Sequence, residues 1–251
     1  MSAVDTLNKK FSSQNFPENH PYNQILDRYK NIALCYAQME NAIAVLSDLR
    51  AKTSYIYYGE FAHTLGIGNK VKNDKISSIW EEEIFRLIHP DDLIDKHLQE
   101  LCFFYFIKNQ PNRKCCDYYL MSKLRMKTST NSYIPALHRM FYIPVSSTDT
   151  LWLALCLYSP LILDFKTKSL IVNSINGKTR EPERQHCTKI LSTREKQILN
   201  LINKGLTSKD IAEMLSISIN TVSRHRQEIL NKLKTKNSIE ACRVAKELDL
   251  L

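Results

Sequence analysis

The hydrophobic pattern is clearest in the last quarter of the chain, where apolar residues recur at helical spacing between helix-start signals. A Ser, Thr or Asn followed three residues later by an acid marks such a start, because the first side chain accepts from a free backbone N–H and the acid reaches back. Three such pairs occur: Ser192 with Glu195, Thr207 with Asp210, and Asn237 with Glu240. With a further helix expected from Ser218, the pattern predicts an all-α domain of four short helices.

The helix expected from Ser218 has two different faces. Its apolar residues share one face: Val222, Ile229, Leu230 and Leu233. Its polar residues share another face: Asn220, Ser223, Arg224, Gln227 and Asn231. Side chains of the second kind pair with base edges in the major groove of DNA, whereas an ordinary solvated face is usually a mixture of Lys and Glu. The pattern therefore favours a helix-turn-helix that binds DNA over a plain helical bundle.

Several short runs in this region carry a resemblance to a known family. They are Leu191-Ser192-Thr193-Arg194-Glu195, Gly205-Leu206-Thr207-Ser208-Lys209-Asp210-Ile211-Ala212, Ile217-Ser218, Thr221-Val222, His225 and Lys232-Leu233. Over about the last quarter of the chain, the sequence resembles the LuxR-type DNA-binding domain. The resemblance implies a four-helix domain whose third helix enters the major groove and whose fourth helix often forms a dimer contact.

The resemblance also implies roles for individual residues. The predicted DNA-binding residues are Lys209, Asn220, Thr221, Ser223, Arg224, Arg226, Gln227 and Lys232. Among them, Ser223, Arg224 and Gln227 are expected to face bases. The family pattern places Lys209, Thr221 and Lys232 toward phosphates, which position a protein on the duplex without specifying sequence.

Two departures from the family pattern bear on affinity. Glu228 stands where Asn is usual, and Ser238 stands where Arg is usual, so both should weaken the attraction to phosphates. The overall charge acts in the other direction. Residues 164–251 hold 17 Lys and Arg against 10 Asp and Glu, while residues 1–163 hold 18 against 16. A basic excess at this end supplies non-specific attraction to DNA.

Upstream, the pattern changes from helical to strand-like spacing. Three runs are predicted as strands: residues 116–127, 133–145 and 150–158. In the first run, Leu120 and Leu124 alternate with Lys123 and Arg125, which is typical of a strand with one solvated face. The third run is apolar on both faces and should lie in the middle of the sheet.

Residues 55–58 and 61–65 are predicted as two earlier strands, followed by helices over residues 80–88 and 93–106. This order of two strands, helices and three strands resembles a PAS domain, over roughly residues 50–160. The resemblance implies a domain that senses a ligand, a cofactor or a partner. The sequence does not identify any of these, so the cofactor is unknown.

Candidate metal ligands and catalytic groups are few. His63, His89 and His97 could ligate a haem iron, but a single His near a helix cap or the surface is more often structural. The seven cysteines lack C-x-x-C spacing, so no metal site is predicted. The run Gly66-Ile67-Gly68 lacks the third Gly and the Lys of a phosphate-binding loop, and no catalytic residue is assigned.

One long helix is predicted near the N-terminus, from about Tyr22 to Arg50. Its apolar residues alternate at spacings of four and three: Ile25, Tyr29, Ile32, Tyr36, Met39, Ile43 and Leu46. Two interpretations stay open, an intermolecular coiled coil or a helix packed on its own sheet.

Membrane and targeting signals are not evident in the sequence. Residues 1–16 are polar, and the longest apolar stretch, residues 151–163, is too short to span a bilayer and contains Pro160. We therefore expect a cytoplasmic protein with no membrane partner.

Together these observations predict an α+β protein with an N-terminal PAS-like antiparallel sheet and flanking helices, plus an all-α four-helix helix-turn-helix domain. The predicted segments are an N-terminal arm and amphipathic helix (1–50), the sensory or dimerising PAS-like domain (51–163), a linker (164–189) and the LuxR-type domain (190–251). The predicted function is sequence-specific transcriptional regulation, with double-stranded DNA, a second copy of the chain and an unidentified small-molecule or protein signal as partners. The alternative is a scaffold protein whose helix-turn-helix no longer binds DNA, as Glu228 and Ser238 suggest.

Overall fold

The computed structural model describes residues 2–68, 73–145, 148, 150–182, 191–233 and 235–247, apart from the side chains of residues 112, 113 and 247. The chain divides into two compact units, one of residues 10–182 and one of residues 183–251 together with residues 1–9. The first unit holds an antiparallel sheet with helices, and the second holds the C-terminal helices. The predicted α+β class is confirmed.

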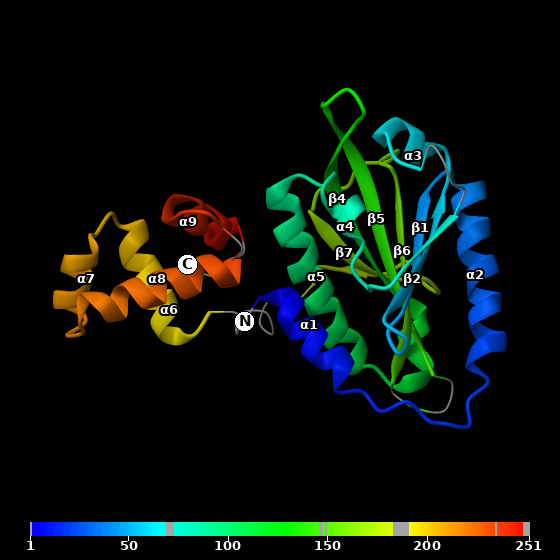
Figure 1. Ribbon diagram of the computed structural model, residues 1–251, viewed down its shortest axis with the longest axis horizontal. Helices are drawn as coiled ribbons and strands as arrows, with labels where there is room; N and C mark the ends of the chain where they lie inside the picture. The colour runs from blue at the N-terminus through cyan, green and yellow to red at the C-terminus, as the bar shows by residue number, and fades with distance from the viewer. Residues whose placement is uncertain are drawn as a thin grey trace. The chain divides into compact units, whose positions relative to one another are not determined.

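Strands in the described part of the first unit form one antiparallel sheet in the order β3-β2-β1-β6-β5-β4-β7-β8 (Figure 1). Their bounds are β1 Ile43–Asp48, β2 Thr53–Tyr58, β3 Asn73–Ile76, β4 Tyr118–Lys127, β5 Tyr133–Pro144, β6 Leu151–Pro160, β7 Ser169–Asn173 and β8 Thr179–Arg180. The three long predicted strands are confirmed as β4, β5 and β6. Strand β6 lies between β1 and β5 and is buried on both faces, as its continuous apolar run predicts.

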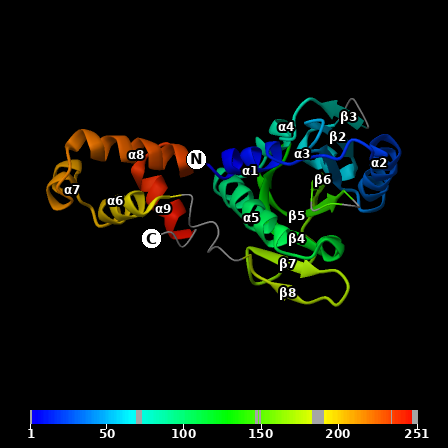
Figure 2. The same ribbon diagram turned by 90° about the horizontal axis from the view of Figure 1, so that it is seen from below.

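Helices cover both faces of this sheet (Figure 2). Helix α2, Tyr22–Met39, packs its buried Ala33 and Ala37 against Leu46 and Leu155 on one face. Helix α5, Pro90–Lys108, lies along β4 on the other face. The short elements α4, Glu82–Phe85, and η1, Asn112–Asp117, flank α5, and α1 spans Ala3–Ser12. The predicted helices around residues 80–88 and 93–106 are therefore confirmed in outline.

The predicted helix from Tyr22 to Arg50 is wrong in its second half. Helix α2 ends at Met39, and Asn41 takes a left-handed φ of 52° that a continuing helix does not permit. Ile43 and Leu46 belong to β1, which pairs with β2 and β6 and is completely buried. A run that is apolar on both sides suits a central strand better than one stripe of a helix. The sheet therefore begins inside the predicted arm, before residue 50.

Because Ile43 and Leu46 belong to β1, the apolar stripe proposed for a coiled coil is shorter than predicted and ends at Met39. The partly buried Ile25, Tyr29 and Tyr36 pack against the core beneath α2. This is the second interpretation, a helix packed on its own sheet. At the end of α2, Glu40 forms an ion pair with Arg139 of β5, which ties the end of the helix to the sheet.

The predicted strand at residues 61–65 is also wrong, because this segment forms helix α3, Glu60–Leu65. Its buried residues Phe61, Ala62 and Leu65 follow helical spacing rather than alternation. Gly66, with a φ of 77°, ends the helix in the left-handed conformation that glycine adopts without steric cost.

The predicted linker, residues 164–189, contributes two strands to the sheet. Strand β7 pairs with β4, and β8 pairs with β7 at the edge of the sheet (Figure 2). Residues 183–189 lie outside the described part of the chain. The sheet thus extends past residue 163, and the proposed boundary between residues 189 and 190 stays a prediction.

The C-terminal unit contains the predicted helices. They are α6 Thr193–Asn203, α7 Ser208–Met214, α8 Ile219–Leu233 and α9 Ser238–Glu247. Two of the three predicted capping boxes, at Ser192 and Thr207, are formed. At the third, Asn237 Oδ1 accepts from the N–H of Glu240, but the Glu240 carboxylate accepts from the N–H of Lys236 instead. Gly205 has a φ of 86° after α6, and the N–H of Leu206 donates to the carbonyl of Leu201, as in a helix-ending Schellman turn.

A small apolar core joins these helices. Its buried members are Ile198, Leu199, Ile211, Ala212, Val222, Ile229, Leu233, Ala241, Val244 and Ala245. Each helix contributes to this core, so the orientation of α8 depends on all of its neighbours. Burial of one such Ile or Leu side chain contributes roughly 1.5–3 kcal/mol.

A buried ion pair crosses this core from α6 to α8. Glu195 is 1% exposed, and both of its carboxylate oxygens accept from Lys232 Nζ, at 2.6 and 2.7 Å. Glu195 also accepts from the backbone N–H of Ser192 at 2.6 Å. Burial alone would raise the pKa of Glu195, but the hydrogen bonds from Lys232 and Ser192 outweigh it and hold the pKa below its usual value of 4.5.

Within the described part of the chain, the helices are too short or too polar to cross a lipid bilayer.

We predict that Glu195→Gln lowers the free energy of local opening of α6 and α8 by about 2 kcal/mol at neutral pH. The substitution removes the negative charge that neutralises the largely buried ammonium of Lys232. The pKa of Glu195 is lower in the folded state than in the unfolded chain. Its stabilisation is therefore present above about pH 4.5 and is lost as the pH falls through the lowered pKa. Hydrogen exchange of peptides from α6 and α8 measures this opening free energy. The difference in opening free energy between the variant and the wild type should become smaller in acid. Glu213→Gln, an exposed acid on α7, is the control, and equal protection in both variants would contradict the prediction.

Candidate nucleic-acid interface

The turn between α7 and α8 places the two helices of the predicted helix-turn-helix. Ser216 has a left-handed φ of 51°, and the N–H of Ile217 donates to the carbonyl of Ala212 at 3.0 Å. The Oγ of Ser218 then accepts from the N–H of Thr221 at 3.1 Å, which caps the start of α8. These local bonds end one helix and start the next within a few residues.

Helix α8 presents a polar stripe on its free side. The exposed members of this stripe are Asn220, Ser223, Arg224, Gln227 and Asn231. Val222, Ile229 and Leu233, which anchor the helix, are buried on its other side. The prediction of one packed face and one polar face on this helix is confirmed.

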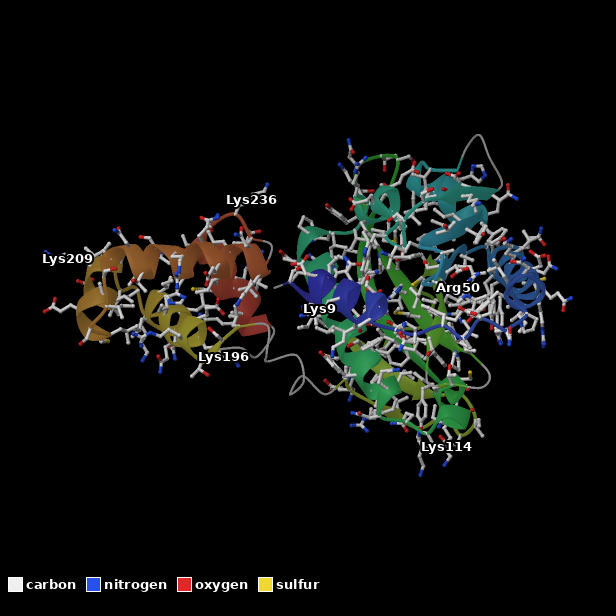
Figure 3. All side chains as sticks on the ribbon, turned by 60° about the horizontal axis from the view of Figure 1, so that its bottom comes forward. Lys9, Arg50, Lys114, Lys196, Lys209 and Lys236 are labelled. Carbon is white, nitrogen blue, oxygen red and sulfur yellow. The ribbon has the colours of Figure 1, made fainter. Side chains whose placement is uncertain are left out.

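Two residues predicted to contact phosphates each lie near the start of a helix, one in α7 and one in α8. Lys209, in the first turn of α7, is exposed (Figure 3). Thr221 is half-buried, and its hydroxyl lies 2.9 Å from the Oγ of Ser218. Both residues thus carry a hydrogen-bond donor in the first turn of a helix.

Arg226 has partners inside the domain. Its guanidinium donates to Ser208 Oγ at 2.9 Å and to Ser238 Oγ at 3.1 Å. It therefore joins the first turns of α7 and α9 to the middle of α8. Ser238 stands where the family pattern has Arg, and in this arrangement its hydroxyl oxygen accepts a hydrogen bond from Arg226.

Lys232 is also engaged within the domain, since its ammonium contacts both oxygens of the buried Glu195. Its side chain is only 20% exposed. The structure thus brings Lys209, Asn220, Ser223, Arg224 and Gln227 to the surface, and it gives Arg226 and Lys232 intramolecular partners.

Glu228 lies beside the polar stripe and contacts two of its neighbours. Its Oε1 is 3.7 Å from Arg224 Nε, and its Oε2 is 3.5 Å from His225 Nδ1. The Arg224 side chain is 70% exposed, so the pair is weak and can separate when a ligand approaches. An acid at this place reduces the positive potential of the stripe.

Sequence reasoning missed two interactions that hold this surface in place. The Glu195 capping box was visible in the sequence, but its ion pair with Lys232 was not, because the two residues are far apart in the chain. Arg194 donates to the carbonyl of Leu215 at 3.0 Å and so joins α6 to the turn before α8. Neither partner could be identified from spacing.

Comparison with known proteins gives a family match in this region. Residues 189–245 match the model of the family described as bacterial regulatory proteins, luxR family. The oxygen regulatory protein NreC of Staphylococcus epidermidis is 38% identical over 92 residues, which are 36% of this chain and 42% of that protein. NreC of Staphylococcus haemolyticus is 41% identical over 91 residues, 34% of this chain and 40% of that protein. The chain thus spans less than half of the length of these relatives.

Solved structures with similarity to the chain are more distant. Phage VqmA in complex with DPO shares 14% identity with a TM-score of 0.32, covering 90% of each chain. The Vibrio cholerae VqmA dimer without target DNA shares 15% identity with a TM-score of 0.29, covering 90% of this chain and 88% of that chain. An RNA-binding light-oxygen-voltage receptor shares 12% identity with a TM-score of 0.33, and the similarity covers 82% of this chain and 48% of that chain.

The family match covers the helices that present the polar stripe, from the Ser192 capping box to the end region of α9. The C-terminal part of this chain, residues 189–245, is therefore similar to the luxR family of bacterial regulatory proteins.

Proposed function

We propose that the chain is a DNA-binding transcriptional regulator that reads the major groove with helix α8. The observation that carries this proposal is the exposed stripe of Asn, Ser, Arg and Gln on α8, in a domain of the luxR family. Selection of binding sites from random double-stranded DNA, followed by mapping of occupied sites in the genome, tests it. Recovery of no enriched sequence would count against it.

In the proposed complex, α8 lies in the groove with its apolar face toward the domain core. Arg224 is long enough to pair bidentately with a guanine, and Gln227, on the neighbouring helical turn, suits an adenine. Asn220 and Ser223 extend the same face, while Lys209 and Thr221 contact phosphates and fix the position of the domain. We assign Arg226 and Lys232 the role of holding α8 in place through their intramolecular partners.

The scaffold alternative has less support than the DNA-binding proposal. It depended on Glu228 and Ser238, which both reduce positive charge relative to the family pattern. Ser238 accepts a hydrogen bond from Arg226, and Glu228 lies against Arg224, so both residues have a place in a working domain. No separate observation favours a domain that has lost DNA binding.

The sheet unit is proposed to be a PAS-like sensory or dimerising domain that controls DNA binding. Its support is the observed chain order, in which strands β1 and β2 come first, helices α3, α4 and α5 follow with the short β3 among them, and three long strands come after. The signal is an unidentified small molecule or protein, and no catalytic role is proposed. A regulator of bacterial genes of this kind would act in the cytoplasm, where the DNA is.

The first prediction of this proposal concerns sequence readout. Arg224→Ala and Gln227→Ala should each lose about 1–3 kcal/mol of discrimination at one base pair, because each removes a base-edge contact. Competition between the selected site and random DNA, at fixed salt, measures this specificity ratio. An unchanged ratio in both variants would show that this face of α8 does not contact bases.

Lys209→Ala is the matched comparison, because a phosphate contact should behave differently from a base contact. It should weaken specific and random DNA alike and make the dependence of log K on log salt shallower by about 0.9. Lys178→Ala, an exposed lysine in the β7–β8 turn, is the control and should leave the salt slope unchanged.

A second prediction concerns Glu228. Glu228→Gln should tighten DNA binding about fivefold, because it removes an acid from the binding surface and frees Arg224 from an exposed ion pair worth under about 1 kcal/mol. Titration of fluorescent DNA measures the change, and Glu181→Gln, an exposed acid in the segment after β8, is the control. Weaker binding by Glu228→Gln would mean that the acid orients Arg224 rather than opposing DNA.

A third prediction concerns assembly, which the family resemblance assigns to the fourth helix. Ile239 on α9 is 85% exposed, which is costly for an apolar side chain unless a partner covers it. We expect the full chain to sediment as a dimer and Ile239→Glu to shift it toward monomer. Ile175→Glu alters another isoleucine that is 75% exposed, in the β7–β8 turn, and should leave the dimer intact. A dimer unaffected by Ile239→Glu would exclude α9 from the interface.

A further inference from the structure

The interior of the sheet unit holds a cluster of polar side chains between α5 and the sheet. Lys96 and Glu100 of α5 are 1% and 2% exposed, and His138 of β5 is completely buried. Cys156 of β6 and Glu81, just before α4, are also buried. Helix α5 runs along this face of the sheet (Figure 1). Charged groups are seldom placed so deep without a compensating partner.

The imidazole of His138 lacks the partners that a buried histidine ordinarily has. Among the described residues, neither of its ring nitrogens has a hydrogen-bond partner. Burial, and then the nearby charge of Lys96, lower the pKa of His138 well below its usual value, so the ring is neutral and one nitrogen offers a free lone pair. That ring nitrogen Nε2 is 3.7 Å from Glu100 Oε1. With the proton of the neutral ring on Nδ1, the lone pair of Nε2 faces a carboxylate oxygen at this distance, and a cation between the two atoms would satisfy both.

Three groups in this cluster suit one divalent transition metal ion. One ligand atom each from Glu100, His138 and Cys156 lies within 4.8 Å of the other two. A zinc ion at about 2.0–2.2 Å from a nitrogen and an oxygen, with a tetrahedral angle, holds them about 3.4 Å apart. This separation is close to the 3.7 Å observed between His138 and Glu100.

The charges of the cluster also favour a divalent cation. With Cys156 as a thiol, the carboxyl groups of Glu81 and Glu100 share the single ammonium of Lys96, and burial raises the pKa of Glu100. A divalent ion with a thiolate at Cys156 gives equal numbers of positive and negative charges in the cluster. Lys96, 2.7 Å from Glu100 Oε1, would then act as a hydrogen-bond donor that orients the ligating carboxylate.

We propose that Glu100, His138 and Cys156 form a site for a divalent transition metal ion, Zn²⁺ first among them, inside the sheet unit. Three protein ligands leave one coordination position for water or a small molecule. On binding, the S–H bond of Cys156 breaks, its sulfur coordinates the ion and the proton passes to solvent, with no change of oxidation state. The mixture of nitrogen, oxygen and sulfur ligands suits zinc or cobalt and disfavours magnesium or calcium.

A second cluster in the C-terminal unit, Glu195, His225 and Glu228, carries less weight. It too has three ligand atoms within 4.8 Å of one another. Only Glu195 of its three members is buried, whereas all three members of the first cluster are buried. This cluster serves as an internal comparison.

The test uses the full chain, reduced and refolded after chelator treatment, because a site this deep is filled most readily during folding. Refolding with Zn²⁺ should leave about one equivalent bound after desalting, measured by elemental analysis. Refolding with Co²⁺ should give intense tetrahedral d–d bands and a sulfur-to-cobalt charge-transfer band.

The variants assign those signals to residues. Cys156→Ser should abolish the charge-transfer band, and His138→Gln should lower metal retention at least tenfold. Cys35→Ser, at an exposed cysteine on α2, and Glu228→Gln, in the second cluster, should leave both signals unchanged. Circular dichroism confirms folding, and Cys156→Ser is the milder change if His138→Gln fails to fold. No retained metal in the wild type, or a charge-transfer band that survives Cys156→Ser, would overturn the proposal and leave water as the partner of His138.

Discussion

The arrangement of the C-terminal helices depends on the burial of one carboxylate, that of Glu195. It accepts from the N–H of Ser192 at the start of α6 and from the ammonium of Lys232 in the last turn of α8. A buried acid without such donors would be strongly unfavourable, so the two helices can meet only where both bonds form. Arg226 adds a second set of bonds from α8 to α7 and α9. The exposed stripe of α8 is therefore presented in one orientation, as base reading requires.

The sheet unit combines a large apolar core with a polar interior on one face. The side under α2 is filled by aliphatic and aromatic groups, whereas the side under α5 contains Lys96, Glu100 and His138. Each unsatisfied buried group costs about 1–3 kcal/mol, and close ring contacts such as Phe103 with Tyr142 at 5.6 Å offset part of this. An interior of this kind is less stable than an apolar one but can respond to a bound charge. Such a property suits a domain that receives a signal.

Local signals allowed most of the C-terminal domain to be predicted. The capping boxes at Ser192 and Thr207 and the two faces of α8 arise within a few residues, so the sequence contains all of their causes. The strand β1 was mistaken for helix because Ile43 and Leu46 fit a heptad spacing by chance, and their burial depends on β6, which is distant in the chain, as well as on the next strand, β2. The partners of Arg226 and Lys232 are likewise set by packing. The cluster of Glu100, His138 and Cys156 depends on strand register, which no spacing in the sequence reveals.

The two ends of the sheet limit how copies of this chain can associate. Strand β3 at one edge is four residues long and carries Asp74 and Lys75, and β8 at the other is two residues long and ends in Arg180. Short, charged edge strands offer few unpaired backbone groups in a row, so a second sheet has little to add to. Continuous sheets across two molecules are thus disfavoured, which protects the chain from aggregation through its edges. Any specific pairing of copies must instead use side chains on helices, whose geometry a bound ligand can alter more easily than that of a hydrogen-bonded ladder.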